Sequence, residues 1–180
     1  MNFKMNAKQL RAGNSKSSIK NLKLKKNNIY LILDNVLDTY NIGSIFRLAD
    51  ALAVKKVYLC GGSQTPPNPR IMKASINTTE WVDWEYASDA VSVIRNLKLK
   101  IKNLQTVAVE QASGSIPYTE FEYKLPTALI VGHESFGVSK ETLKLCDGVV
   151  EIPMFGVNIS LNVMVSLGIV LYEVIKKAKA

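Results

Sequence analysis

The stretch NIYLILDNVLDTYNIGSIFRLADALAVKKVYLC, residues 28–60, carries the clearest fold signal of the chain. Its apolar run at residues 29–33 predicts a buried strand, the helical spacing of apolar residues over 42–53 predicts a helix, and residues 54–60 predict a second strand. A strand, a helix and a strand that follow one another in this way place the two strands parallel. We therefore expect the folded part of the chain to begin with a parallel sheet.

The same alternation continues along the rest of the chain. Further strands are predicted at residues 106–110, 127–131 and 149–152. Further helices are predicted at residues 70–75, 88–97, 139–145 and 159–177, and loops at residues 63–68 and 111–124. Strands that are this rich in β-branched and apolar residues are buried on both faces. We expect an α/β fold, with a mostly parallel sheet covered by helices on both faces.

The positive charge of the chain is concentrated at its N-terminus. The chain has 180 residues, of which 23 are basic and 15 acidic, for a formal net charge of +8. The basic residues among the first 26 are Lys4, Lys8, Arg11, Lys16, Lys20, Lys23, Lys25 and Lys26, and no acidic residue lies among them. We expect a basic, flexible arm over residues 1–27 and one folded domain over residues 28–180. Such an arm either binds a polyanion or is a solvated tail, and it lacks the aromatic and leucine stripe of a membrane-binding helix.

Several classes of protein are disfavoured by the sequence. The longest apolar candidate for a membrane span, residues 163–174, is interrupted by polar and small residues, and the basic residues 1–26 contain no apolar segment of a signal peptide. We therefore predict a cytoplasmic protein. Cys60 and Cys146 lie far apart, and the single histidine, His133, has no Cys or His at ligand spacing, so we expect buried thiols and neither a metal site nor a disulfide.

Three loops are candidates for a functional site, because ligands of parallel sheets bind beyond the carboxyl ends of the strands. The first loop and the helix start that follows it span residues 34–47. Here Asn41 can cap the following helix with its side chain, and Gly43 allows a close approach of another backbone. Arg47, on the second turn of that helix, is either a surface residue or a functional cation.

The second candidate loop spans residues 131–139. Gly132 and Gly137 are five residues apart, a spacing that allows a sharp turn but is neither that of a dinucleotide-binding fingerprint nor that of a P-loop. Glu134 between them is either a general base or a solvated side chain. The sequence alone leaves both readings open.

The third candidate loop, residues 152–162, joins a predicted strand to the last helix. Its backbone amides and the N-terminus of that helix can hold an anionic group such as a carboxylate. Asn158 and Ser160 are the candidates for the N-cap of the helix. Either residue can combine this structural role with a functional one.

Taken in order, the three loops resemble the motifs of the SpoU family, the TrmH-like branch of the SPOUT RNA methyltransferases. The motifs are Asn41-x-Gly43-x-x-x-Arg47, then Gly132-x-Glu134-x-x-Gly137, then Ile152-Pro153-Met154 followed by Ser160-Leu161-Asn162. Each is weak alone, whereas the ordered set is highly specific and the resemblance covers residues 28–177. The segments Pro66-Pro67-x-Pro69-Arg70-Ile71-x-Lys73-Ala74 and Trp81-Val82-x-Trp84-Glu85 also look like those of the tRNA-type members. Ser44 and His133 stand where the family frequently has Ala and Asn.

This resemblance implies an S-adenosylmethionine-dependent RNA ribose 2′-O-methyltransferase, a homodimer whose C-terminal part is tied in a trefoil knot. RNA is the implied partner, with tRNA favoured over rRNA, and no metal is required. The residues implied to bind the cofactor S-adenosylmethionine are Val131, Gly132, His133, Ile152, Met154, Ser160 and Leu161. The residues implied to face the ribose, and so to be catalytic, are Arg47, Asn41, Glu134, Ser160 and Asn162.

The sequence leaves alternatives for the function and for one mechanistic role. An rRNA target and a non-catalytic RNA-binding module of the same fold stay open, whereas a Rossmann oxidoreductase is disfavoured because no Gly-x-Gly-x-x-Gly follows the first strand. The family assigns its arginine a direct role in activating the 2′-hydroxyl. Because a guanidinium is a poor proton acceptor, we favour the hypothesis that Arg47 clamps the adjoining phosphate and stabilises the developing alkoxide.

Overall fold

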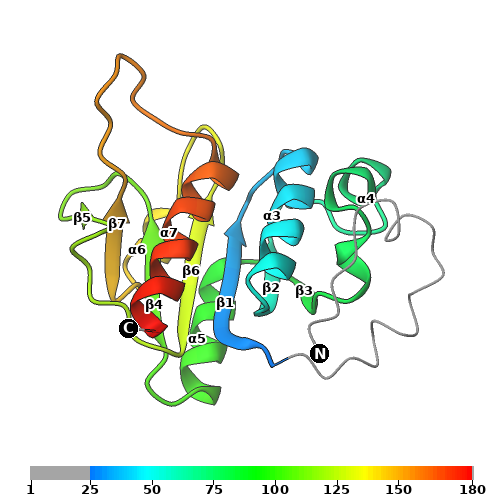
Figure 1. The fold of residues 1–180 in the computed structure, drawn as a ribbon, viewed down its shortest axis with the longest axis horizontal. Helices are drawn as coiled ribbons and strands as arrows, with labels where there is room; N and C mark the ends of the chain where they lie inside the picture. The colour runs from blue at the N-terminus through cyan, green and yellow to red at the C-terminus, as the bar shows by residue number, and fades with distance from the viewer. Residues whose placement is uncertain (1–24, 180) are drawn as a thin grey trace.

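Parallel strands form the centre of the molecule. The computed structural model describes residues 25–179 and shows a seven-stranded sheet with the order β3-β2-β1-β6-β4-β7-β5 (Figure 1). The strands are β1 (Asn27–Asp34), β2 (Val54–Cys60), β3 (Trp84–Ala87), β4 (Gln105–Val109), β5 (Ile116–Pro117), β6 (Thr127–Gly132) and β7 (Gly148–Glu151). All neighbouring strands of this sheet pair in parallel, which confirms the predicted parallel sheet.

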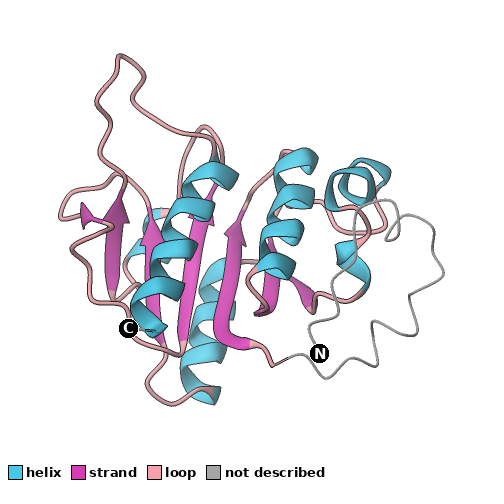
Figure 2. Ribbon diagram, in the orientation of Figure 1, coloured by secondary structure: helices cyan, strands magenta, loops and turns pink. Residues whose placement is uncertain are grey.

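Helices cover both faces of the sheet (Figures 1 and 2). They are α3 (Thr39–Ala51), α4 (Pro69–Ser75), α5 (Ala90–Lys100), α6 (Lys140–Leu143) and α7 (Val163–Lys179), with one 3-10 turn, η1 (Thr78–Glu80). Helices α3 and α7 lie on one face, and α5 and α6 lie on the other. The predicted α/β architecture is confirmed, while the trefoil knot implied by the family resemblance stays a prediction.

Strand β1 shows why its sequence is apolar at almost every position. Successive side chains of a strand point to opposite faces of the sheet. Leu31 and Leu33 belong to the core cluster that packs against α3 and α7, whereas Tyr30 and Ile32 belong to the cluster beneath α5. All four are buried. A strand with a hydrophobic core on each side needs apolar residues on both of its faces, so it lacks the polar alternation of a surface strand.

The strands at the centre of the sheet end at the same level. Asp34, the last residue of β1, is in register with Cys60 of β2 on one side and with Gly132 of β6 on the other. The chain moves outward from β1 to β2 and β3, and the later strands lie on the opposite side of β1, where β6 is next to β1 and β4, β7 and β5 follow outward. The strand order therefore reverses between β1 and β6, and such a switch point is where open parallel sheets bind ligands.

Helices α3 and α7 are capped by residues other than those predicted. The N-cap of α3 is Asp38, whose Oδ1 accepts hydrogen bonds from the backbone N–H of Tyr40 at 2.7 Å and of Asn41 at 3.3 Å. The prediction that Asn41 caps this helix is therefore wrong, because the helix has already begun. Asn162 caps α7, since its Oδ1 accepts from the N–H of Met164 at 2.9 Å.

The last helix is consequently shorter than predicted. It begins at Val163, so the prediction of a helix from residue 159 is wrong, and so is the prediction that Asn158 or Ser160 is its N-cap. Asn158 instead closes a turn within the loop, where its Oδ1 accepts from the N–H of Ser160 at 3.2 Å. Ile159 lies in the same loop and is 78% exposed.

Two short strands were absent from the predictions. Strand β3 is four residues long and partly exposed, and it lacks the apolar run that identifies the central strands. Strand β5 consists of Ile116 and Pro117, so the prediction that residues 111–124 form only loop is wrong. Both strands are held by pairing with a single neighbour, β2 or β7, and this pairing depends on tertiary structure rather than on local sequence.

Gly43 allows two helices to approach closely. A Cβ at this position would lie 2.6 Å from the Cβ of Ala74 and 2.7 Å from the carbonyl oxygen of Ile71, both in α4. A larger residue would push α4 away from α3. The predicted close backbone approach at Gly43 is confirmed, and the approaching backbone is that of α4.

The two cysteines are shielded from solvent, and the described region holds neither a metal-binding cluster nor a membrane-spanning helix. Cys60 is buried, Cys146 is half-buried, and burial raises the pKa of each thiol to about 12. Both thiols therefore stay protonated and unreactive at neutral pH. Within residues 25–179, no group of three His, Cys, Asp or Glu side chains is arranged to hold a metal ion, and no helix is long and apolar enough to cross a membrane.

Candidate active site

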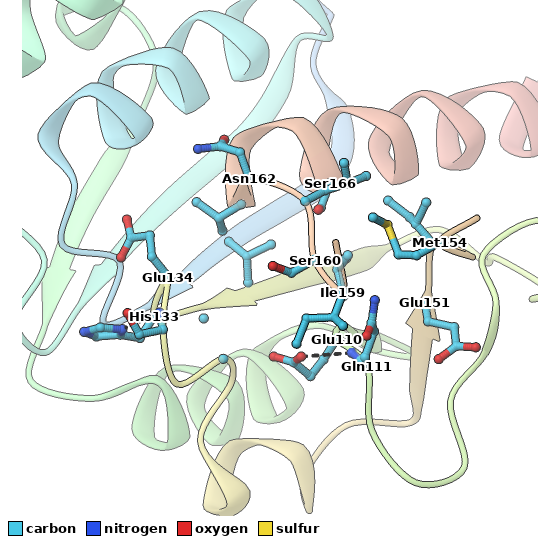
Figure 3. A pocket seen from close by; sticks show the side chains of 18 of the residues that line it. Glu110, Gln111, His133, Glu134, Glu151, Met154, Ile159, Ser160, Asn162 and Ser166 are labelled. Carbon is cyan, nitrogen blue, oxygen red and sulfur yellow. Dashed lines mark hydrogen bonds between the residues drawn. The ribbon is translucent and has the colours of Figure 1, made fainter. Parts of the chain in front are cut away.

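A cavity of about 570 Å³ opens at the carboxyl ends of β4, β6 and β7. Its walls come mainly from two loops, the 132–138 loop after β6 and the 152–162 loop between β7 and α7 (Figure 3). All residues predicted to bind a cofactor line it: Val131, Gly132, His133, Ile152, Met154, Ser160 and Leu161. Three residues predicted to be catalytic, Glu134, Ser160 and Asn162, line it as well. The structure thus brings together two of the three predicted loops around a volume that suits a small organic ligand.

The two glycines of the 132–138 loop are required by its geometry. The loop is a tight turn in which the N–H of His133 donates to the carbonyl of Gly137 at 3.0 Å and the N–H of Gly137 donates back at 2.8 Å. A Cβ on Gly132 would overlap the backbone of Gly137, and a Cβ on Gly137 would overlap the carboxylate of Glu110. Gly137 also has a positive φ of 68°. The predicted sharp turn is confirmed, and each glycine has its own steric reason.

Glu134 connects this loop to the start of α3. Its Oε1 accepts hydrogen bonds from the N–H of Asp38 at 2.9 Å and from the amide of Asn41 at 3.1 Å, and its Oε2 accepts from the N–H of Leu37 at 3.1 Å. Asn41 in turn accepts at its Oδ1 from the side-chain amide of Asn162 at 2.9 Å. One hydrogen-bonded chain therefore links residues from all three predicted loops.

The surroundings of Glu134 keep it ionised. Partial burial by itself would raise the pKa of this carboxyl, but hydrogen bonds from the backbone of Asp38 and Leu37 and from Asn41 outweigh that effect and lower it. A carboxylate with a lowered pKa, already bonded to three donors, is a weak proton acceptor at neutral pH. Glu134 is not simply a solvated side chain, because three donors hold it between two loops, and its role as a general base stays a prediction. It is an anchor between loops.

Arg47 lies apart from the cavity in the single chain. It is exposed on α3 and is not among the residues that line the cavity. Arg47 comes six residues after Asn41, which corresponds to about 9 Å along a helix axis and to a different helix face. Within residues 25–179, no ion pair involves its guanidinium. Asn41, Glu134 and Asn162 are thus brought together, whereas Arg47 is not.

The 152–162 loop presents apolar side chains to the outside. Phe155 is 96% exposed and Val157 fully exposed, while Met154 and Ser160 line the cavity. At the end of the loop, the Oδ1 of Asn162 accepts from the N–H of Met164 and of Val165, so these two amides of α7 are not available to the anionic group that the sequence analysis expected there. The chemistry of this loop lies in its cavity-facing residues.

Some residues of the site were missed by sequence reasoning. Glu110, Gln111 and Glu151 also line the cavity, each at or just after the carboxyl end of a strand. Position after a strand was the available signal, but it did not distinguish these residues from other loop residues. Asp34 has a structural role at the same edge, since its Oδ2 accepts from the N–H of Ser139 at 3.1 Å and from its hydroxyl at 2.8 Å.

Comparisons with known proteins agree with this geometry. Residues 28–172 match the model of the SpoU rRNA Methylase family. The chain is 34% identical over 154 residues to the tRNA (guanosine(18)-2′-O)-methyltransferase of Aquifex aeolicus, covering 84% of this chain and 71% of that protein. It is 34% identical over 153 residues to the 23S rRNA (guanosine-2′-O-)-methyltransferase RlmB of Photorhabdus laumondii, covering 82% of this chain and 59% of that protein.

A solved structure of an rRNA methyltransferase has a similar fold. The AdoMet-bound rRNA methyltransferase from Sinorhizobium meliloti superimposes with a TM-score of 0.77 at 28% identity, covering 88% of this chain and 59% of the other chain. The chain thus spans about three fifths of that larger protein. Since the family model matches well over half of its residues, this chain belongs to the SpoU rRNA methylase family.

Proposed function

We propose that this chain is an S-adenosylmethionine-dependent methyltransferase that modifies a ribose 2′-hydroxyl of RNA, with tRNA as the favoured substrate. The observation that carries the proposal is the hydrogen-bonded chain from Glu134 through Asn41 to Asn162 at the edge of a cavity lined by the predicted cofactor residues. Family membership and the tRNA and rRNA 2′-O-methyltransferase names of its relatives support the activity. The AdoMet-bound state of the Sinorhizobium meliloti relative supports the cofactor.

The residues of the cavity fit S-adenosylmethionine chemically. Its volume of about 570 Å³ lies in the range of small-molecule sites, and Val131, Ile152 and Leu161 give it apolar walls that suit an adenine ring. The charged side chains that line it are all acidic: Glu110, Glu134 and Glu151. A sulfonium and an ammonium against one carboxylate make this cofactor a net cation. The charge of the cavity is therefore complementary to it.

The residues of this chain act by positioning and by exclusion of water. When bound, the cofactor supplies an electrophilic methyl group, which needs an attacking oxygen in line with it. Asn41, Ser160 and Asn162 provide neutral polar groups beside the cavity that can orient a ribose, and Glu134 holds Asn41 in place. In-line alignment of two reactants contributes about 7–11 kcal/mol in favourable cases, so positioning can account for much of the rate.

Arg47 enters the proposal through a second copy of the chain. In one chain its guanidinium does not line the cavity, yet it is exposed and without a described acidic partner. Near it, α3 and α7 expose apolar side chains, with Tyr40 at 52%, Val165 at 39% and Tyr172 at 57%. Exposed apolar patches of this kind mark interaction surfaces. A homodimer formed through this face would let Arg47 of one subunit clamp the phosphate beside the ribose held by the other.

The basic arm completes the proposed RNA contact. The predicted arm covers residues 1–27, most of which lie outside the described part of the chain, so its role is argued from charge alone. Cations that neutralise phosphates release counterions and make binding depend on salt concentration. We assign residues 28–180 to the methyltransferase domain, and a cytoplasmic location fits an RNA substrate.

A methyl-transfer assay tests the proposal. Purified protein is incubated with methyl-labelled S-adenosylmethionine and either unmodified tRNA or unmodified rRNA, and nuclease digests are analysed for ribose-methylated nucleosides by mass spectrometry. We expect label in 2′-O-methyl nucleosides of tRNA. Label confined to rRNA would replace the substrate class, and the absence of cofactor binding in a calorimetric titration would favour the non-catalytic RNA-binding module.

A further inference from the structure

Glu110 is a carboxylate of the cavity that the proposed mechanism does not use. It follows β4 directly and lines the cavity together with Gln111. Figure 3 shows both residues on one side of the cavity, with Asn162 and Ser166 on the other. The side that carries Asn162 faces the proposed ribose of the RNA. Glu110 therefore lies where the body of a bound cofactor would extend.

Two backbone amides hold this carboxylate in one orientation. Its Oε1 accepts from the N–H of Gln111 at 2.9 Å, and its Oε2 accepts from the N–H of Val138 at 2.8 Å. The absence of a side chain on Gly137 makes room for Oε2. An ionised carboxylate offers about four lone-pair positions, so one on each oxygen stays available. The available pair is fixed in direction by the two amide bonds.

The other carboxylates of the cavity are differently engaged. Glu134 accepts from three donors and is tied to the start of α3. Glu151 accepts from the hydroxyl of Ser115 at 2.6 Å and lies near Met154 in Figure 3. Glu110 alone among these three combines one bonded and one available position on each of its two oxygens. The available acceptor positions on the two oxygens of Glu110 lie side by side, so they suit a ligand with two neighbouring donor groups.

We propose that Glu110 binds the vicinal 2′ and 3′ hydroxyls of the cofactor ribose, one on each carboxylate oxygen. The inference rests on the proposed function, because it requires the chain to bind S-adenosylmethionine. The bond from Val138 to the same carboxylate would then couple ribose binding to the position of the 132–138 loop, which carries Glu134. Glu110 would thus bind the cofactor directly and at the same time position the loop that faces the RNA.

The test is a binding cycle between the protein and the ligand. The affinity of S-adenosylhomocysteine and of its 2′-deoxy and 3′-deoxy forms is measured by titration calorimetry for the wild type, for Glu110→Ala and for Glu110→Gln. Hydrogen bonds to a charged group are worth about a tenfold to hundredfold change in affinity, so we expect Glu110→Ala to lose about that factor for the parent ligand. We further expect each deoxy form to bind more weakly than the parent to the wild type but about equally well to Glu110→Ala.

A matched control and a folding check accompany the cycle. Glu151→Gln removes a negative charge from the same cavity, and we expect it to keep the full wild-type penalty for the deoxy ligands. Thermal unfolding of Glu110→Gln, which keeps an oxygen for the N–H of Val138, separates binding from loop stability. Should Glu110→Ala unfold, the cycle is read from Glu110→Gln, where a reduced deoxy penalty supports the inference.

Three outcomes would overturn the inference, and they differ in what else they affect. If the wild type binds S-adenosylhomocysteine but the deoxy penalty is the same in the Glu110 variants, the ribose contact is wrong while the proposed function stands. The same holds if these variants lose affinity equally for all ligands, because Glu110 would then act only through Val138. If the wild type binds neither S-adenosylmethionine nor S-adenosylhomocysteine, the proposed function fails together with the inference.

Discussion

The two loops that form the cavity are held in opposite ways. The 132–138 loop is fastened at both ends, since Glu110 accepts from the N–H of Val138 and Glu134 accepts from the backbone of the segment before α3. The 152–162 loop projects from the carboxyl end of the sheet as the orange segment in Figure 1. Its side chains Phe155 and Ile159 are 96% and 78% exposed.

This difference indicates two different tasks. The fastened loop is a preformed wall, which lowers the entropy lost when a ligand binds. The projecting loop carries exposed apolar side chains, and their burial against a ligand or another surface would be favourable through the hydrophobic effect. In our proposal the cofactor covers the side of this loop that lines the cavity. In a single chain, the 132–138 side of the cavity is therefore preformed, whereas the 152–162 side still exposes apolar side chains.

The largest effect is expected from removal of the Arg47 side chain, which in our proposal acts on the site of the other subunit. We expect Arg47→Ala to lower kcat/KM for RNA about 100-fold to 1000-fold, the range for loss of one donor to a developing oxyanion. Arg47→Lys should recover only part of this, because it keeps the charge but loses the planar fork. Steady-state methylation kinetics measure both, and Arg95→Ala, on α5 at the opposite face of the sheet, is the control for loss of one exposed cation.

A heterodimer shows which subunit supplies Arg47. Arg47→Ala and Asn162→Ala chains are co-expressed with different tags, and the mixed dimer is isolated. If Arg47 acts across the interface, the mixed dimer has one intact site and should regain a substantial part of the wild-type activity, although each variant alone is nearly inactive. An inactive mixed dimer would mean that Arg47 and Asn162 of one and the same subunit serve one site, and would contradict the shared arrangement.

The next largest effect should come from a glycine in the fastened loop. Gly132→Ala introduces a Cβ that overlaps the backbone of Gly137, so we expect it to lower the free energy of unfolding by about 3 kcal/mol. Gly156 in the projecting loop has no atom within 4 Å of its Cβ position, so Gly156→Ala should change the free energy of unfolding by less than about 0.5 kcal/mol. Urea unfolding of both variants measures the contrast, and equal effects would show that the two loops are equally constrained.

A smaller effect is expected from the anchor between the loops. Glu134→Gln keeps the shape of the side chain but replaces one of its two acceptor oxygens with a donor amide. Hydrogen bonds to charged groups contribute about 1.5–3 kcal/mol, and because Glu134 is partly exposed we expect the lower end, about a tenfold loss in kcat/KM. Glu141→Gln, at an exposed position on α6, serves as the control. Unchanged kinetics in Glu134→Gln would mean that the 132–138 loop does not need this anchor.

The smallest effect is the pH dependence of that anchor. Folding lowers the pKa of Glu134 from its usual 4.5, so its contribution to stability is fully present above about pH 4.5 and is lost as the pH falls through the lower value. The contribution should not exceed about 1 kcal/mol, since the side chain is partly exposed. Urea unfolding of the wild type and of Glu134→Gln at pH 7 and below pH 4 measures it. The stability difference between them should shrink in acid, and a difference that grows would contradict the lowered pKa.

Much of the architecture could be predicted because it depends on local patterns. Apolar runs of strand length that alternate with helical patterns specify a parallel sheet with two helical layers, and β1 is apolar at nearly every position because it has a core on each side. The ends of these strands then identify the candidate loops. The short strands β3 and β5 could not be found in this way, since each depends on pairing with one distant neighbour.

The residues that cap helices and the hydrogen-bond partners of side chains could not be predicted from local sequence patterns. Helix α3 has two candidate caps, Asp38 and Asn41, and helix α7 has three, Asn158, Ser160 and Asn162. Only the packing of the helices selects Asp38 and Asn162. Local propensity does not distinguish neighbouring residues of similar chemistry.

The sequence by itself determined the fold class, the family and the loops that carry the site, because strand and helix periodicity and ordered motifs are local properties of the chain. Only the tertiary structure decided what the polar residues do. Glu134 and Asn41 are 93 positions apart, and their contact makes Glu134 an ionised anchor between two loops. Glu110 became a candidate cofactor ligand in the same way. The role of a carboxylate depends on the donors and the burial around it, and these are assembled only when distant segments pack together.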